Sequence, residues 1–230
     1  MIRAARIEDA DGIAAVHVRS WQMAYVGLVP QNYLDTLSVD QRRAAWERIL
    51  AETAGPRSGT LVAEDDDIVI GFVHLCPTRD ADHDSHTVGE IASIYVLAEA
   101  WGTGTGRALM AAALDRLTHA GFARATLWVL DTNHRARRFY ETGPWQLDGA
   151  TKRDDLRGFP LSEVRYACRL PVEDACTRTL VSPSFKPPSP PDHPRFRFEP
   201  LGPEHNAADL DAWSSSIDHI HVTNFQSFDH

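Results

Sequence analysis

Ala98-Glu-Ala-Trp-Gly-Thr-Gly-Thr-Gly-Arg-Ala108 is the stretch that decides the fold. The apolar, β-branched run 91–97 before it predicts a strand, and the helical spacing of small and apolar residues after it predicts a helix over 108–120. Between them, Gly102, Gly104 and Gly106 stand at alternate positions. Glycine tolerates positive φ, so the backbone N–H groups of such a turn can surround an anion, and the helix start adds unpaired donors. The stretch therefore predicts a phosphate-binding turn.

The glycines alone do not say which phosphate is bound. A tight strand-to-helix connection without a ligand is the plainest alternative. A dinucleotide-binding turn needs G-x-G-x-x-G and an acidic residue about twenty positions on, whereas this turn reads G-x-G-x-G and lacks the acid. A triphosphate-binding loop needs Gly-Lys-Ser/Thr, which is absent from the turn.

Composition limits the class of protein. The 230 residues suffice for one good-sized domain plus an appendage, and 43% apolar and 24% charged residues are globular values. A net charge of −9 argues against a nucleic-acid partner. Three cysteines without metal-like spacing favour a reducing compartment and no metal, and neither an apolar leader nor a membrane-length apolar run is present. We expect a cytoplasmic protein with no membrane partner; a homodimer stays open.

The order of predicted elements indicates a mixed α/β layer rather than a doubly wound sheet. The expected strands are 1–5, 60–64, 68–76, 91–97, 125–130 and 163–170, and the expected helices begin near residues 9–11 and 30 and cover 41–53, 108–120 and 133–141. Three aspartates, 65–67, are typical of a tight hairpin between two strands. The polar segment 80–86 has residue types that bind metals, but a loop between strands is the simpler interpretation.

A second motif narrows the prediction. The helix Asn133-His-Arg-Ala-Arg-Arg-Phe-Tyr-Glu141 matches Asn-x-x-Ala-x-x-Phe-Tyr-Glu in full, and Trp101-Gly-Thr-Gly-Thr-Gly106 matches Gln/Arg-x-x-Gly-x-Gly/Ala except at Trp101. With these two motifs, residues 1 to about 170 resemble the GNAT superfamily of acetyl-CoA-dependent N-acetyltransferases. The resemblance implies an α+β GNAT fold, with a mixed, mostly antiparallel, twisted sheet of six to seven strands flanked by helices.

The resemblance also implies a site for acetyl-CoA as co-substrate. Its pyrophosphate would meet the turn residues Trp101, Gly102, Thr103, Gly104, Thr105, Gly106 and Arg107, mainly through backbone N–H groups. Main-chain groups of Ile94, Tyr95 and Val96 would pair with the pantetheine arm where two strands splay apart. Asn133 would hydrogen-bond near that arm, and an arginine of the same helix, with Arg137 as the candidate, would reach a phosphate. Trp101 would lose one side-chain contact.

Two residues carry the implied chemistry, in which a small-molecule or peptide amine attacks acetyl-CoA directly in a ternary complex. Tyr140 would stand beside the sulfur as the proton donor, and Glu90 would be the general base. Three of the candidate site residues have a simpler alternative: Tyr140 as a core aromatic, Glu90 as a solvated strand-end acid, and Asn133 as a helix N-cap only. A non-catalytic acyl-CoA-binding sensor is the alternative function. The acceptor would be chosen by residues 21–37 and by loops 77–88 and 150–162.

The chain changes composition at Pro171. Prolines concentrate between residues 183 and 203, so we expect residues 1–170 to be the acetyltransferase domain and 171–195 to be a semi-rigid linker. Residues 196–230 resemble the first strand and helix of a second acetyltransferase-like domain, but they are too few to complete one.

Overall fold

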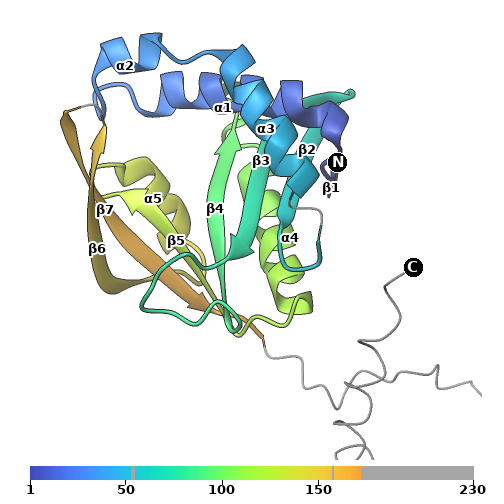
Figure 1. The fold of residues 1–230 in the computed structure, drawn as a ribbon, viewed down its shortest axis with the longest axis vertical. Helices are drawn as coiled ribbons and strands as arrows, with labels where there is room; N and C mark the ends of the chain where they lie inside the picture. The colour runs from blue at the N-terminus through green and yellow to red at the C-terminus, as the bar shows by residue number, and fades with distance from the viewer. Residues whose placement is uncertain (53–54, 157, 172–230) are drawn as a thin grey trace, which may run out of the picture. The chain divides into compact units, whose positions relative to one another are not determined.

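A computed structural model describes residues 1–52, 55–156 and 158–171 (Figure 1). The strands are β1 Ile2–Ala4, β2 Gly59–Asp65, β3 Ile68–Pro77, β4 Val88–Val96, β5 Arg124–Leu130, β6 Gln146–Leu156 and β7 Phe159–Arg169. The helices are α1 Ala10–Ala24, α2 Gln31–Asp35, α3 Val39–Glu52, α4 Thr105–His119 and α5 His134–Glu141. The predictions for the linker 171–195 and the segment 196–230 fall outside the described residues, apart from position 171.

One seven-stranded sheet, in the order β1-β2-β3-β4-β5-β7-β6, forms the centre of the fold. Among the strands that the structure describes, only β4 and β5 pair in parallel, which confirms the predicted mixed, mostly antiparallel sheet. The expected loop 150–162 is wrong, because Thr151 to Leu156 of β6 pair with β7 as a hairpin. Strand β6 is exposed along most of its length and carries the charged run Lys-Arg-Asp-Asp at 152–155, so no apolar alternation marks it in the sequence.

The parallel pair of strands is short. β4 pairs with β5 only from Val88 to Glu90, and the two strands then diverge, as Figure 1 shows. Ala92 has no partner on β3, because Ile91 pairs with Leu75 and Ser93 with His74. This bulge lies just past the last β4–β5 pair, and bulges bend the strand that carries them. The consequence is a V-shaped opening in the middle of the sheet.

Helices cover both faces of the sheet. Helix α4 packs on β2, β3 and β4 from one face through residues such as Leu109, Ala113 and Leu117. Helix α1 packs on β3 and β4 from the other face, and α3 packs on α1, with Trp46 fully in the core. None of the helices in the described ranges is long and apolar enough to cross a membrane. The β6–β7 half of the sheet has no such helix in front of it in Figure 1.

Two partly buried histidines, His17 and His74, make the stability of this fold depend on pH. Burial, with a smaller contribution from Arg42, lowers the pKa of His17 to about 3; burial is also the largest cause that lowers the pKa of His74 to about 4. In the unfolded chain both would take a proton near the usual value of 6.5. The unfolded state therefore binds more protons between about pH 6.5 and 4, so stability falls as pH falls through that window, by up to about 1.4 kcal/mol per pH unit and histidine.

Urea unfolding at about pH 7.5, 6.0 and 5.0, values on both sides of the usual histidine pKa, measures the loss of stability. His17 accepts a hydrogen bond from the indole N–H of Trp46 at 3.2 Å, so His17→Gln is expected to reduce the pH slope. His134→Gln, at an exposed position on α5, is the control that keeps the slope. An equal slope in wild type and His17→Gln would contradict the assignment.

Candidate active site

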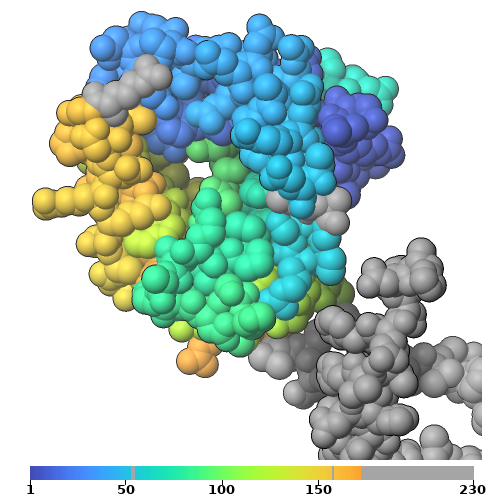
Figure 2. All heavy atoms as spheres, in the orientation of Figure 1, coloured from blue at the N-terminus to red at the C-terminus, as the bar shows by residue number. Residues whose placement is uncertain are grey.

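A cleft of about 720 Å³ opens where β4 and β5 diverge. It reaches from the glycine turn to α1, and Figure 2 shows the surface hollowed between the N-terminal helices, β4 and the β6–β7 hairpin. Its volume lies within the range of small-molecule sites. Of the predicted site residues, it brings together Glu90, Ile94, Tyr95, Val96, Trp101, Gly102, Gly104, Gly106, Arg107, Asn133 and Tyr140.

The glycine turn has the conformation that the anion-binding prediction requires. Gly102 has φ 80° and Gly104, the N-cap of α4, has φ 95°. A Cβ atom at either position would meet nothing within 4 Å, so backbone conformation and not crowding demands glycine there. Gly104 provides no side-chain cap for α4, and the Thr105 N–H donates only at 3.5 Å to the Thr103 hydroxyl, so the N–H groups that follow remain for another acceptor. Thr103 and Thr105 hydrogen-bond to each other through their hydroxyls at 2.8 Å and do not line the cleft.

The edge of β4 that faces the opening has spare main-chain groups. The Leu97 N–H donates to Ile70 O, so the antiparallel alternation turns the amide groups of Val96 and Ile94 away from β3 and toward the opening. Tyr95, between them, directs its amide groups to β3. The main-chain groups of Ile94 and the N–H of Val96 are therefore available for the predicted strand-like pairing with an extended ligand. The main-chain groups of Tyr95 are not available, because they face β3.

Trp101 is fixed against this same edge. Its indole N–H donates to the Val96 carbonyl at 2.8 Å, and the Arg135 guanidinium lies over its ring, 3.6 Å from the centroid. The Ser20 hydroxyl also donates to the Val96 carbonyl, at 3.3 Å. This carbonyl is thus satisfied within the chain. The side chain that departs from the family motif joins the turn to β4 and α5.

Helix α5 orients its polar residues unequally. Asn133 is its N-cap, accepting from the Ala136 N–H at 3.1 Å, and it also lines the cleft. Arg137, the predicted phosphate ligand, is turned away: its guanidinium donates to the Tyr166 hydroxyl at 3.1 Å and to Asp131 O at 2.9 Å. Arg135 and Arg138 line the cleft instead. The rotation of α5 about its own axis decides which of these arginines face the cleft, and the sequence alone does not give that rotation.

Tyr140 lies at the bottom of the cleft with only 7% of its surface exposed. Its ring meets those of Phe139, Trp145 and Tyr166. Burial, reinforced by Tyr95, raises the pKa of its phenol well above 10. The group therefore keeps its proton across the neutral range and can donate one. Tyr140 is therefore packed among core aromatic rings and also lines the cleft, so the two interpretations of this residue are compatible.

Glu90 lies where the strands begin to diverge and is 3% exposed. Arg79 supplies three donors to its carboxylate: the backbone N–H at 3.1 Å, Nε at 3.2 Å and an Nη group at 2.5 Å. It is therefore not a solvated strand-end acid. A carboxylate held in this way is well positioned in the cleft but has few lone pairs left to accept a substrate proton directly.

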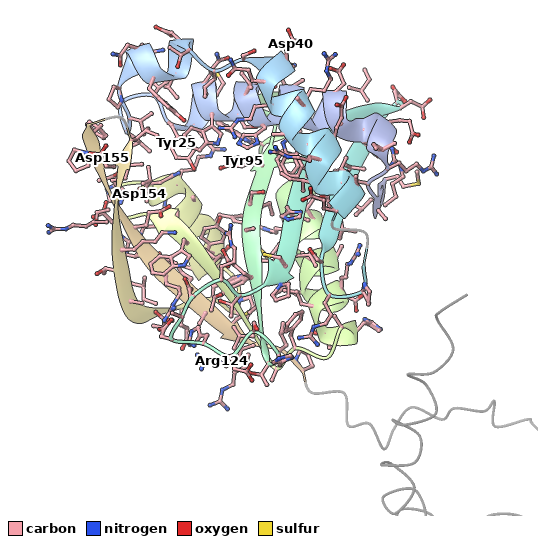
Figure 3. The ribbon with its side chains drawn as sticks, viewed as in Figure 1. Tyr25, Asp40, Tyr95, Arg124, Asp154 and Asp155 are labelled. Atoms are coloured by element: carbon pink, nitrogen blue, oxygen red, sulfur yellow. The ribbon has the colours of Figure 1, made fainter. Side chains whose placement is uncertain are left out.

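Aromatic side chains form the other end of the cleft. The Trp21 indole N–H donates to the Tyr95 hydroxyl at 2.9 Å, and Tyr25 stacks on Trp21 with ring centroids 4.5 Å apart. The phenols of Tyr25 and Tyr95 share a hydrogen bond, and Figure 3 labels both residues, Tyr25 at the end of α1 and Tyr95 on β4. Leu156 and Leu161, at the tip of the β6–β7 hairpin, pack in the same cluster as Tyr25 and so close this side.

The segment between β3 and β4 is held by an ionic cluster. Arg165, 4% exposed on β7, donates to Asp80 at 3.0 Å, to Asp82 at 2.6 Å and to Asp148 at 2.7 Å. Asp80 also accepts from the Trp128 indole at 3.0 Å. Two of the residues that resembled metal ligands, Asp80 and Asp82, are therefore committed to Arg165, which holds loop 77–88 on the β5–β7 half of the sheet.

Three cleft residues belong to neither sequence motif: Trp128 on β5, Lys152 on β6 and Glu163 on β7. Of these, only Lys152 falls in a range, 150–162, that was expected to choose the acceptor. Lys152 Nζ lies 3.0 Å from Glu163 Oε2 and 4.5 Å from the Trp128 ring centroid. Burial is the main cause that raises the pKa values of Tyr25 and Tyr95, and the charge of Glu163 adds to both. No sequence motif connects these residues. The alternation of side chains along β7, which pairs with β5, is the one sequence pattern that could have indicated that Glu163 faces the cleft.

Comparison with known families settles the class. The model of the acetyltransferase (GNAT) family matches residues 21–143, which include both predicted motifs. The chain belongs to the GNAT acetyltransferase family. An uncharacterized N-acetyltransferase of Bacillus subtilis, YuaI, is 33% identical over 133 residues, covering 57% of this GNAT chain and 72% of the relative. An uncharacterized N-acetyltransferase of Archaeoglobus fulgidus is 35% identical over 139 residues, covering 60% of this chain and 88% of the relative.

Solved structures agree on the GNAT fold. The PaiA N-acetyltransferase of Thermoplasma acidophilum, in complex with coenzyme A, aligns with a TM-score of 0.55 at 21% identity over 74% of this chain and 98% of its own. YncA of Salmonella typhimurium, a putative acetyltransferase with its cofactor acetyl-CoA, aligns with a TM-score of 0.56 at 20% identity over 74% and 93%. At such identities the likeness shows the fold alone.

Proposed function

We propose that this GNAT protein transfers the acetyl group of acetyl-CoA to a primary amine by direct attack in a ternary complex. The observation that carries the proposal is the single cleft that joins a positive-φ glycine turn, the free edge of β4 and a buried tyrosine. The turn and Arg107, Arg135 and Arg138 offer donors for the phosphates, and Ile94 offers its main chain to the pantetheine arm. The acceptor enters from the aromatic end.

The amine must lose a proton before it attacks. A free alkyl amine has a pKa of about 10.4, so holding it neutral at pH 7 costs about 4.6 kcal/mol. Two cleft carboxylates, Glu90 and Glu163, can reduce this cost by accepting the proton. Because Arg79 occupies Glu90, we propose that Glu90 acts through a water molecule and that Glu163 meets the ammonium directly.

The departing thiolate needs a proton, and Tyr140 is the proposed donor. A phenol near pKa 10 is about 1.5 units less acidic than a thiol near 8.5, and burial widens this gap. Transfer is therefore uphill as a separate step and is feasible if it is concerted with cleavage of the C–S bond. Asn133, whose side-chain oxygen caps α5, keeps its amide N–H groups for the arm of the co-substrate.

Thiol release from acetyl-CoA, measured against a panel of amines, tests this function. The panel contains a free amino acid, an alkyl diamine, a peptide with a free N-terminus and a lysine-containing peptide with a blocked N-terminus. We expect turnover of at least one primary amine and none of its N,N-dimethylated counterpart. Calorimetric binding of acetyl-CoA without turnover of any amine would favour the acyl-CoA-binding sensor, and no binding of acetyl-CoA would exclude both functions.

A further inference from the structure

Lys152 is the most unusual residue of the cleft. Only two of the 23 lysine and arginine residues of the chain are lysines, Lys152 and Lys186. The other basic side chains that line the cleft are arginines, whose guanidinium groups stay protonated and are not acyl acceptors at neutral pH. Lys152 is therefore the one side chain in the cleft with a primary amine of the kind that the proposed reaction consumes.

The position of Lys152 is that of a bound amine. Strand β6 is the outermost strand, yet the Lys152 ammonium reaches inward across β7 to lie 3.0 Å from the Glu163 carboxylate and 4.5 Å from the Trp128 ring centroid on β5. A carboxylate and the face of an indole are the two groups that hold an alkylammonium ion most effectively. Both groups line the same cleft as Tyr140 and Ile94.

We propose that Glu163 and Trp128 form the subsite for the acceptor's ammonium group, that Lys152 fills this subsite in the free enzyme, and that Lys152 is acetylated by its own chain when acetyl-CoA is bound without an acceptor. The inference rests on the proposed function, since it uses the same donor and the same cleft. It also specifies the acceptor as a primary amine on an unbranched alkyl chain, because the lysine side chain fits there.

The self-acetylation step balances without a further reactant. Lys152 Nζ gives one proton to Glu163, and its lone pair forms the N–C bond with the thioester carbonyl as the C–S bond breaks. The thiolate takes the Tyr140 proton, which the Glu163 proton replaces through solvent. The second of the three ammonium protons leaves Nζ to solvent after the N–C bond forms, and the third is retained in the amide. The products are N-acetylated Lys152, coenzyme A as the thiol and one proton released to solvent.

The test is incubation of the full chain with acetyl-CoA alone, followed by intact mass measurement and peptide mapping. We expect one acetyl group per chain, at Lys152, with Lys186 unmodified. Glu163→Gln should slow the acetylation at least about tenfold, because the proton acceptor and the anchoring charge are lost together. Gly104→Asp, which removes the cradle for the donor, should leave Lys152 unmodified and so separates enzymatic from spontaneous acetylation.

A matched variant moves the amine by one residue. The double change Lys152→Arg with Arg153→Lys keeps composition and charge, but alternation along β6 places side chain 153 on the opposite face of the sheet. No acetyl group is expected at position 153. Equal acetylation at positions 152 and 186 in the wild type, or acetylation of the swapped variant at the wild-type rate, would overturn the inference.

Two results separate the inference from the function on which it rests. If the wild type acetylates an amine of the panel but Lys152 stays unmodified without acceptor, the self-acetylation is wrong and the function stands. If acetyl-CoA neither binds nor is consumed, both fall. An amine that is turned over should also slow Lys152 acetylation in proportion to its occupancy of the site, and a substrate that leaves this rate unchanged would contradict a shared subsite.

Discussion

Gly104→Asp is expected to weaken coenzyme A binding by at least about a hundredfold, or about 2.7 kcal/mol. Two effects combine at this position. Gly104 has φ 95°, which an L-residue adopts only with strain, and its missing side chain leaves open the space in front of the α4 N-terminus. A carboxylate there would oppose the pyrophosphate with its charge. Isothermal calorimetry with coenzyme A measures the loss.

A second glycine provides the control for this variant. Gly121, after the C-terminal end of α4, has φ 82° and likewise has nothing within 4 Å of an added Cβ. Gly121→Asp brings the same charge and comparable backbone strain at the far end of the helix, so it should lower the melting temperature and leave coenzyme A affinity within about twofold. Normal affinity in Gly104→Asp would place the phosphate site elsewhere.

Tyr140→Phe should lower kcat by about 10²- to 10⁴-fold, the usual contribution of a general acid, with the affinity for acetyl-CoA nearly unchanged. The change removes one hydroxyl from a ring held by Phe139, Trp145 and Tyr166, so the aromatic packing is retained. Because the phenol keeps its proton in the neutral range, its loss should lower the rate without removing a limb of the pH profile below pH 9, about one unit under the usual phenol value. Steady-state kinetics with an amine from the panel gives both quantities.

Tyr166→Phe is the matched control, because Tyr166 belongs to the same cluster of rings but does not line the cleft. Its hydroxyl donates to Glu141 and accepts from Arg137, so its removal should reduce stability and leave kcat close to the wild-type value. If the two variants lose the same activity, Tyr140 acts through packing and its role as proton donor is wrong.

The parts of this site that the sequence predicts are those encoded locally. Gly104 and Asn133 each follow from a short motif whose backbone conformation depends on neighbours in the chain, as a positive-φ turn and a helix N-cap do. The mixed sheet follows from the same order of strands and helices. Backbone-mediated binding leaves such a local signature because glycine and capping residues are selected by their own φ and ψ.

The remaining parts depend on contacts between distant strands. Glu163 meets Lys152 only because β6 pairs with β7, and β6 has a charged, exposed sequence without the alternation of a half-buried strand. Arg79, which lies in the loop between β3 and β4, donates hydrogen bonds to the Glu90 carboxylate. The rotation of the short helix α5 decides that Arg135 faces the cleft and that Arg137 is turned away from it. Side-chain partners at such separations are fixed by tertiary structure and have no local pattern.

The three-residue junction between β4 and β5 also has a consequence for cooperativity. Within the described residues, it is the only strand pairing that joins the β1–β4 half of the sheet to the β5–β7 half. In the proposed complex, the co-substrate would lie as an extended chain between the diverging strands, with Ile94 on one side and α5 on the other. Saturation would then add its binding free energy to the folding of both halves, about 2.7 kcal/mol at a hundred times Kd. Without acetyl-CoA, the two halves of the sheet are therefore expected to unfold less cooperatively than they do in the complex. The co-substrate would then also stabilise the junction between the two halves.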